Sequence, residues 1–231
     1  MNNLVLVRHG QSIWNKERRF TGWVDVDLTD QGVLEAVSAG KLIKELKIEF
    51  NLYFTSKLKR AIKTLKKINK VLNKQNMKTI KTTALNERHY GGLTSLNKDE
   101  TIKKYGYKQV QIWRRGFNTP PPLMSTDHPY KKKINSNVLG ESLKDTFDRV
   151  IPYYKSAIEP QIIDQKNILI ALHGNSCRAI LMKILNISEK KIPQLEIPTG
   201  NPILIQFDDK IKVKKYRYLD TKRAKKILFN I

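Results

Sequence analysis

Two histidines stand at the ends of short apolar runs, and each is followed by a glycine. His9 follows the run at residues 3–7, and His173 follows Ile168–Leu172. Continuous apolar runs of this length are typical of strands buried on both faces of a parallel sheet. Parallel strands end at one edge of such a sheet, and ligands bind at that edge. The two imidazoles are therefore expected to share one pocket, although either alone would be typical of a hydrogen-bonded core residue.

Two arginines are expected at the same edge. Arg8 directly precedes His9, and Arg60 lies in the first turn of a helix that follows the strand predicted at residues 52–55. A helix that follows a parallel strand starts at the carboxyl end of that strand, which places Arg60 beside the histidines. A guanidinium binds two oxygens of one phosphate, a contact that lysine does not reproduce. These residue types favour a pocket for a phosphorylated ligand.

Helical patterns follow several of the predicted strands. Apolar residues recur at helical spacing after Thr29, after Ser56 and from about Ser142. Thr29 or Asp30 is expected to cap the first of these helices, and Ser56 the second. Pro152 is expected to distort the third.

The alternation of strands and helices predicts the fold class. A further helix is predicted at residues 176–185, and residues 203–213 are predicted to form a hairpin. We expect an α/β fold: a three-layer sandwich with a mainly parallel central sheet covered by helices on both faces. Residues 1–231 are expected to form a single catalytic domain, with a surface excursion at 117–140 and a basic C-terminal tail at 220–231.

Composition and charge narrow the class of protein. The 231 residues include 44 Lys and Arg against 21 Asp and Glu, so the net charge is +23. A basic protein of this kind binds either nucleic acid over a basic surface or a small phosphorylated ligand in a basic pocket. Lysines make up 33 of the 44 cations and are spread along the chain. This spread favours a solvated, lysine-coated surface over a nucleic-acid interface.

Other features bear on location and on metals. No apolar run approaches the roughly 18 residues that span a bilayer, and the first ten residues contain no cleavage site of a secretory signal. We therefore expect a cytoplasmic protein without membrane contact. The single cysteine, Cys177, forms no internal disulfide, and four scattered histidines argue against a metal site.

Several sequence blocks occur in the order that one known family carries them. They are LVRHGQSIWN at 6–15, RFTGW at 19–23, LKRA at 58–61, LNERHYG at 85–91, WRRGF at 113–117, HGNS at 173–176 and IPTG at 197–200. Together they resemble the cofactor-dependent phosphoglycerate mutases of the histidine phosphatase superfamily. The resemblance covers residues 4 to about 219.

The resemblance implies a role for each matching residue. His9 would be the phosphorylated nucleophile, and Glu87 the general acid and base. The phosphoryl oxygens would be stabilised by charged or hydrogen-bonding groups of Arg8, Arg60, His173 and Asn15 and of the backbone N–H of Gly174 or Asn175. The carboxylate and the non-reacting phosphate would be held by Arg88, Tyr90, Lys98, Arg114 and Arg115. Further contacts to substrate are implied for Gly10, Ser12, Thr21 and Gly22.

The family also implies a reaction and its partners. Its members interconvert 2-phosphoglycerate and 3-phosphoglycerate in glycolysis and gluconeogenesis through a phosphohistidine that 2,3-bisphosphoglycerate primes, without a metal. A homodimer is implied, and residues 221–231 are a candidate cover for the pocket. The alternative within the superfamily is a phosphomonoesterase that acts on bisphosphoglycerate, in which water accepts the phosphoryl group from His9. A nucleic-acid-binding protein is the less favoured alternative.

Overall fold

A six-stranded sheet forms the centre of the molecule over residues 2–224, the part of the chain that the computed structural model describes. The strands lie in the order β3-β2-β4-β1-β5-β6. Strands β1 to β4 are parallel, and β5 and β6 add an antiparallel hairpin beside β1. The strands are β1 (Asn2–Arg8), β2 (Leu52–Ser56), β3 (Thr79–Thr82), β4 (Ile168–Leu172), β5 (Pro202–Phe207) and β6 (Val213–Tyr218).

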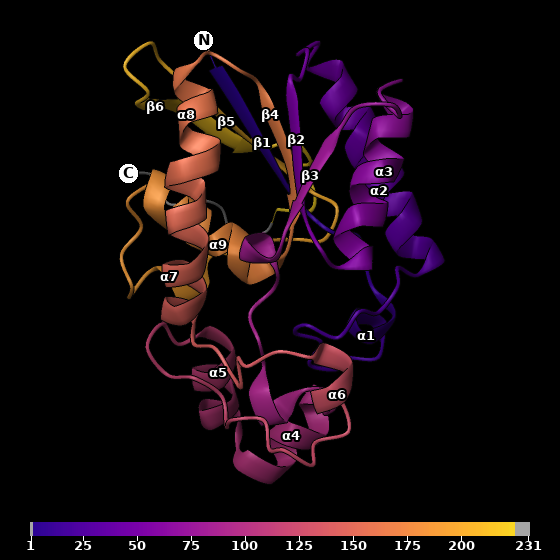
Figure 1. Ribbon diagram of the computed structural model, residues 1–231, viewed down its shortest axis with the longest axis vertical. Helices are drawn as coiled ribbons and strands as arrows, with labels where there is room; N and C mark the ends of the chain where they lie inside the picture. The colour runs from indigo at the N-terminus through magenta and orange to yellow at the C-terminus, as the bar shows by residue number, and fades with distance from the viewer. Residues whose placement is uncertain (1, 225–231) are drawn as a thin grey trace.

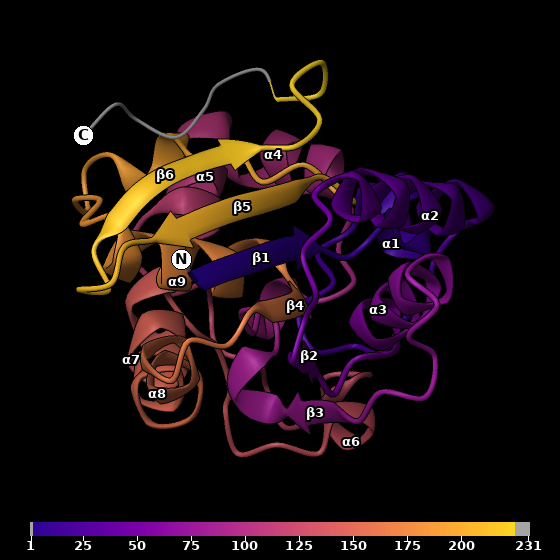
Figure 2. The same cartoon turned by 90° about the horizontal axis from the view of Figure 1, so that it is seen from above.

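Helices cover both faces of this sheet, as Figure 2 shows. One face carries α2 (Asp30–Glu45) and α3 (Lys59–Val71), and the other carries α7 (Leu143–Tyr153), α8 (Glu159–Ile163) and α9 (Gly174–Ile184). The predicted α/β sandwich with a mainly parallel sheet is therefore confirmed.

Both faces of β1 are buried, which explains its continuous apolar run. Leu4 and Leu6 pack into the core beneath α7, α8 and α9, whereas Val5 and Val7 pack on the opposite face with residues of α2 and α3. All four side chains are fully buried. Strand β1 pairs in parallel with β4, with Arg8 opposite Leu172, so the carboxyl ends of the two strands lie side by side.

A group of short helices lies beyond these carboxyl ends (Figure 1). The group contains the predicted excursion at residues 117–140, which includes one helical turn, α6. The helices are α1 (Ile13–Lys16), α4 (Lys98–Tyr105), α5 (Tyr107–Arg115) and α6 (Lys131–Ile134). The remaining short elements of the described chain are η1 (Thr83–Leu85), η2 (Gly91–Leu93), η3 (Tyr154–Ile158) and η4 (Ile192–Gln194).

Two predicted helix starts need correction. Thr29 caps α2 as expected, since its side chain accepts a hydrogen bond from the Gly32 N–H. Ser56 does not cap α3, because β2 extends through it and the helix begins two residues after Lys57. The N-cap position is Leu58, and the Ser56 hydroxyl accepts a hydrogen bond from the Leu58 N–H. Helix α9 begins at Gly174 rather than at residue 176.

The predictions for Pro152 and for the hairpin are largely confirmed. Pro152 lies inside α7, and the helix passes into a π-helical turn, η3, directly after it. In the hairpin, β6 begins at Val213, whereas Ile211 lies in the turn with a φ of +60° and belongs to neither strand.

The C-terminal residues that the structure describes are held against the body of the protein. Arg223 donates to the Thr199 carbonyl and forms an ion pair with the buried carboxylate of Glu35, at 3.1 Å. The other oxygen of Glu35 accepts from the Gln11 N–H at 2.8 Å, close to the end of β1. Residues 225–231 of the predicted tail lie outside the described residues.

None of the helices within residues 2–224 combines the length and the apolar character needed to cross a bilayer.

Two glycines allow α2 to touch the backbone that follows β1. A β-carbon at Gly10 would lie 2.1 Å from the Gly32 carbonyl oxygen, and one at Gly32 would lie 2.0 Å from the Gln11 carbonyl oxygen. Neither distance is compatible with a side chain, so both contacts require glycine. The backbone next to His9 is thereby packed directly against the first turn of α2.

Gly32→Ala is expected to destabilise the protein by about 1–3 kcal/mol, the usual cost of forcing extra volume into a packed site. The sign of this change in unfolding free energy is informative, because alanine in an open helix position stabilises a protein by about 1 kcal/mol relative to glycine. Urea unfolding measures the change, with the exposed neighbour Gln31→Ala as the control. A Gly32→Ala protein as stable as the parent would contradict the close backbone contact.

Candidate active site

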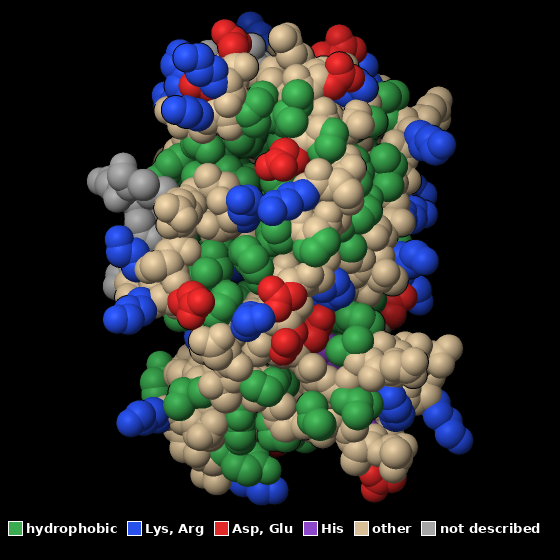
Figure 3. Space-filling view, turned by 60° about the vertical axis from the view of Figure 1, so that its left-hand side comes forward, with side chains coloured by type: hydrophobic (Ala, Val, Ile, Leu, Met, Phe, Trp, Pro, Cys, Tyr) green, Lys and Arg blue, Asp and Glu red, His purple; other side chains and the backbone are tan. Residues whose placement is uncertain are grey.

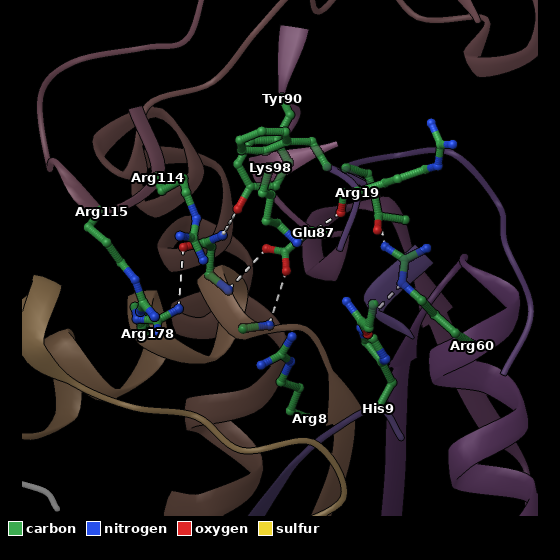
Figure 4. A pocket seen from close by; sticks show the side chains of 16 residues that line it. Arg8, His9, Arg19, Arg60, Glu87, Tyr90, Lys98, Arg114, Arg115 and Arg178 are labelled. Atoms are coloured by element: carbon green, nitrogen blue, oxygen red, sulfur yellow. Dashed lines mark hydrogen bonds between the residues drawn. The ribbon is translucent and has the colours of Figure 1, made fainter. Parts of the chain in front are cut away.

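A polar cavity of about 110 Å³ lies at the carboxyl edge of the sheet. Figure 4 shows His9 and Arg60 at one end of it, Arg115 and Arg178 at the other, and Glu87 between them. The cavity is lined by Arg8, His9, Asn15, Arg19, Phe20, Thr21, Gly22, Arg60, Glu87, Tyr90, Lys98, Arg114, Arg115, Gly174, Asn175 and Arg178.

The tautomer of His9 is determined by its two hydrogen bonds. Its Nδ1 lies 2.7 Å from the Gly10 carbonyl oxygen, and a carbonyl only accepts, so Nδ1 carries the proton. Its Nε2 accepts from the Arg60 Nε–H at 3.2 Å, which requires a free lone pair. Burial and the nearby charges of Arg60 and Arg8 hold the pKa of His9 well below its usual value. His9 is therefore a neutral imidazole with Nε2 available as a nucleophile.

Arg60 is buried beside His9, in the first turn of α3. Its Nη1 and Nη2 groups donate to the carbonyls of Val24 and Gly22, at 2.9 and 2.7 Å. These contacts fix the guanidinium plane next to Nε2 of His9. Burial lowers the pKa of Arg60 to about 10, so the group stays charged at neutral pH.

His173 lies behind His9 rather than in the cavity lining. The two ring centroids are 5.0 Å apart, in an edge-to-face arrangement. The Nε2 of His173 lies 2.7 Å from the Ser56 hydroxyl oxygen, so the residue expected to cap α3 instead holds this second imidazole. Burial and the charge of Arg60 lower the pKa of His173 well below its usual value. His173 is thus neutral before ligand binds.

The Glu87 side chain lies against the N-terminus of α9. Its carboxylate accepts from the N–H groups of Gly174 at 3.2 Å and Asn175 at 3.0 Å. The N–H groups expected to contact a phosphoryl group are therefore engaged with Glu87 in this structure. Burial raises the pKa of Glu87, but the Arg88 N–H hydrogen bond and the charges of Arg8 and Arg60 outweigh burial and lower it below its usual value. Glu87 is a carboxylate at neutral pH.

The cations at the other end of the cavity have few anionic partners. Arg115 keeps its Nη1 buried without a hydrogen bond to any described residue, and the same holds for Nε of Arg8. Lys98 donates to the Arg19 carbonyl at 2.9 Å, and burial lowers its pKa to about 8. Tyr90 contributes its hydroxyl, which accepts from the Asn175 amide at 3.3 Å.

Not every predicted contact residue reaches the cavity. Gly10, Ser12, Arg88 and His173 are absent from its lining. The Ser12 side chain instead caps α1. Arg88 is fully buried, and its Nη2 donates to the carbonyls of Trp113 and Arg114, which positions the end of α5.

Three lining residues were not predicted as contacts: Arg19, Phe20 and Arg178. Arg19 and Phe20 belong to the RFTGW block, so the resemblance could have indicated them as contact residues. Arg178 follows the HGNS block by two residues, where helical spacing alone would have returned it to the edge of the sheet.

Charge dominates the electrostatics of the cavity. Its lining contains seven Lys or Arg side chains and a single carboxylate, that of Glu87. Buried cations are stable only when they are paired or hydrogen-bonded, and Nε of Arg8 and Nη1 of Arg115 have no hydrogen-bond partner among the described residues. The donor set fits a ligand with several negative charges, such as an organic molecule that carries phosphate and carboxylate groups.

Comparison with curated proteins finds close relatives along nearly the whole chain. A 2,3-bisphosphoglycerate-dependent phosphoglycerate mutase of Maricaulis maris is 47% identical over 235 residues, which cover 97% of each chain. One of Pelagibacter ubique is also 47% identical, over 237 residues and 99% of each chain.

Solved structures with the same fold include two phosphatases. A mycobacterial glucosyl-3-phosphoglycerate phosphatase superposes with a TM-score of 0.71 at 22% identity, covering 94% of this chain and 97% of that one. A putative alpha-ribazole-5'-P phosphatase of Escherichia coli gives 0.72 at 18% identity, covering 96% and 98%. The family model that matches residues 4–217 is the histidine phosphatase superfamily, branch 1. The chain belongs to this branch of the histidine phosphatase superfamily.

Proposed function

We propose that the protein is a 2,3-bisphosphoglycerate-dependent phosphoglycerate mutase that interconverts 2-phosphoglycerate and 3-phosphoglycerate in glycolysis. The observation that carries the proposal is the neutral His9, whose free Nε2 faces a cavity with seven cations and one carboxylate. The mutase relatives, 47% identical over the full chain, support the choice of reaction. A homodimer in the cytoplasm is part of the proposal and rests on the resemblance alone.

The first displacement uses Nε2 of His9. Its lone pair attacks phosphorus, a bond from Nε2 to phosphorus forms, and the bond from phosphorus to the ester oxygen breaks. The N–H of Arg60 that donates to Nε2 becomes free when Nε2 bonds to phosphorus, and it can then donate a hydrogen bond to a phosphoryl oxygen. Since Nδ1 donates to the Gly10 carbonyl, positive charge that develops on the ring is stabilised.

Glu87 protonates the leaving oxygen and accepts a proton from the incoming hydroxyl. As a carboxylate it is ready for the second of these tasks, whereas the first requires a higher pKa. The charges of Arg8 and Arg60 hold the pKa of Glu87 down, and a bound polyanion compensates those charges. Ligand binding therefore raises the pKa of Glu87 toward the value that a general acid needs.

When bound, 2,3-bisphosphoglycerate would provide the phosphoryl group that primes His9. The lining fits it, because the buried N–H groups of Arg8 and Arg115 lack partners among the described residues. Arg8, Arg60 and Asn15 would hold the transferred group, and Lys98, Arg114 and Arg115 the remaining charges. Arg88 acts indirectly, through the carbonyls of α5.

A phosphomonoesterase is the alternative within the superfamily, and side-by-side mutase and phosphatase assays with and without bisphosphoglycerate decide between them. For a nucleic-acid-binding protein, a continuous basic surface is needed. On the face shown in Figure 3, Lys and Arg side chains are separated by hydrophobic, acidic and neutral ones.

His9→Ala is expected to abolish mutase turnover and acid-labile phosphorylation by labelled bisphosphoglycerate, because the nucleophile is lost. Phosphopeptide mapping of the parent should place the label on His9. His128→Ala, which changes a histidine outside the cavity lining, is the control. Label that persists in His9→Ala, or that maps to His173, contradicts the assignment.

Glu87→Gln is expected to lower mutase turnover by about 10²-fold or more, the usual contribution of a general acid and base. Phosphorylation of His9 by p-nitrophenyl phosphate should fall much less, since its leaving group needs little protonation. Glu100→Gln, at an exposed position of α4, serves as the control. Near-parental turnover would assign proton transfer to another group.

Arg60→Lys is expected to slow phosphoenzyme formation by about 10²-fold, in the range for loss of one preorganised donor. Lysine keeps the charge but cannot hold the Gly22 and Val24 carbonyls and the His9 ring together. Rapid-quench labelling measures the rate, with the exposed Arg217→Lys as the matched control. An unchanged rate would show that the guanidinium geometry is unimportant.

A further inference from the structure

Arg178 is a buried cation at the end of the cavity opposite His9, one turn into α9 (Figure 4). Its exposed fraction is 6%. Its Nε and Nη2 both donate to the Leu195 carbonyl, at 3.1 and 2.8 Å. Its Nη1 lies 3.5 Å from the Asn175 side-chain oxygen, a weak contact.

No carboxylate of the described chain forms an ion pair with Arg178. Burial, with the charges of Arg115 and Arg8, lowers its pKa to about 9, which still leaves it charged at neutral pH. A buried charge that meets only neutral oxygens costs stability. Packing alone would be served better by an apolar residue, so the guanidinium points to a ligand.

The backbone at Gly174 leaves room for Arg178 to reach the cavity. A β-carbon at Gly174 would lie 3.3 Å from Nη1 of Arg178, 3.7 Å from Nε of Arg8 and 3.7 Å from Oε2 of Glu87. Two guanidinium groups therefore lie around this glycine, with the Glu87 carboxylate as the charge that partly offsets them. Arg115, which lines the same end, keeps its Nη1 unpartnered among the described residues. An anionic group bound there would relieve the repulsion among all three.

We infer that Arg178 binds the anionic group of the substrate that is not transferred, together with Arg115. The inference rests on the proposed function and adds a residue that determines specificity: Arg178 selects ligands that carry a second anionic group besides the phosphoryl group at His9.

The same contacts orient the guanidinium before ligand arrives. Arg178 is held by the Leu195 carbonyl, and Nη1 of Arg8 donates to the Ile197 carbonyl at 2.8 Å. One segment of three residues thus supports two of the cavity's arginines. Arg178 requires little reordering to bind an anion, which favours affinity.

The test compares two ligands of matched skeleton in a His9→Ala background, where no chemistry follows binding. Titration calorimetry at constant ionic strength gives the dissociation constants of 3-phosphoglycerate and of glycerol 3-phosphate, which lacks the carboxylate. Arg178→Met should raise the dissociation constant of 3-phosphoglycerate by at least tenfold. It should raise that of glycerol 3-phosphate by threefold at most. Arg178→Lys should recover part of the difference, because it restores the charge without the planar group.

Lys183→Met removes one charge from an exposed position of the same helix and is the control for net charge. If Arg178→Met weakens both ligands equally, or neither, the inference is wrong. Thermal unfolding monitors folding, and if Arg178→Met does not fold, Arg178→Gln, which removes the charge but keeps hydrogen-bond donors, replaces it under the same criteria. If the His9→Ala parent itself binds 3-phosphoglycerate no better than glycerol 3-phosphate, the proposed function fails, and the inference with it.

Discussion

The concentration of positive charge around one carboxylate is the constraint on which the rest of the site depends. Among the described residues, seven cations line the cavity and Glu87 is the one carboxylate. Repulsion among them would push flexible side chains into solvent, so each must be held by its own contacts. Backbone carbonyls supply these contacts. Gly22 and Val24 hold Arg60, and Leu195 holds Arg178.

Carbonyl groups suit this task because they orient a cation without neutralising it. A carboxylate partner would compete with the ligand for the guanidinium, whereas a neutral oxygen leaves its charge available. The protein therefore carries a local destabilisation that ligand binding relieves. The same logic explains Glu87, whose carboxylate rests on the N-terminus of α9 rather than on an arginine side chain.

Local sequence signals predicted every strand except β3 and placed Arg8, Arg60 and the two histidines at one edge of the sheet, whereas the other predicted cavity residues came from the resemblance to the mutases. The runs that end at His9 and His173 are buried on both faces, so their apolar pattern is continuous, and Arg60 follows from the strand-to-helix connection. Less was predictable where contacts join distant segments. The hydroxyl of Ser56 bonds to the ring of His173, 117 positions away, rather than capping α3, and Arg178 passes close to the backbone of Gly174. The short β3 was missed because lysine and threonine replace its apolar positions.

The contact between Glu35 and Arg223 sets a limit on how the C-terminal end can be engineered. The Glu35 carboxylate joins Arg223 to the Gln11 N–H, two residues after the nucleophile. A chain truncated before Arg223 would leave the buried carboxylate of Glu35 without its cationic partner, beside the end of β1. Shortened versions made for crystallisation should therefore retain Arg223.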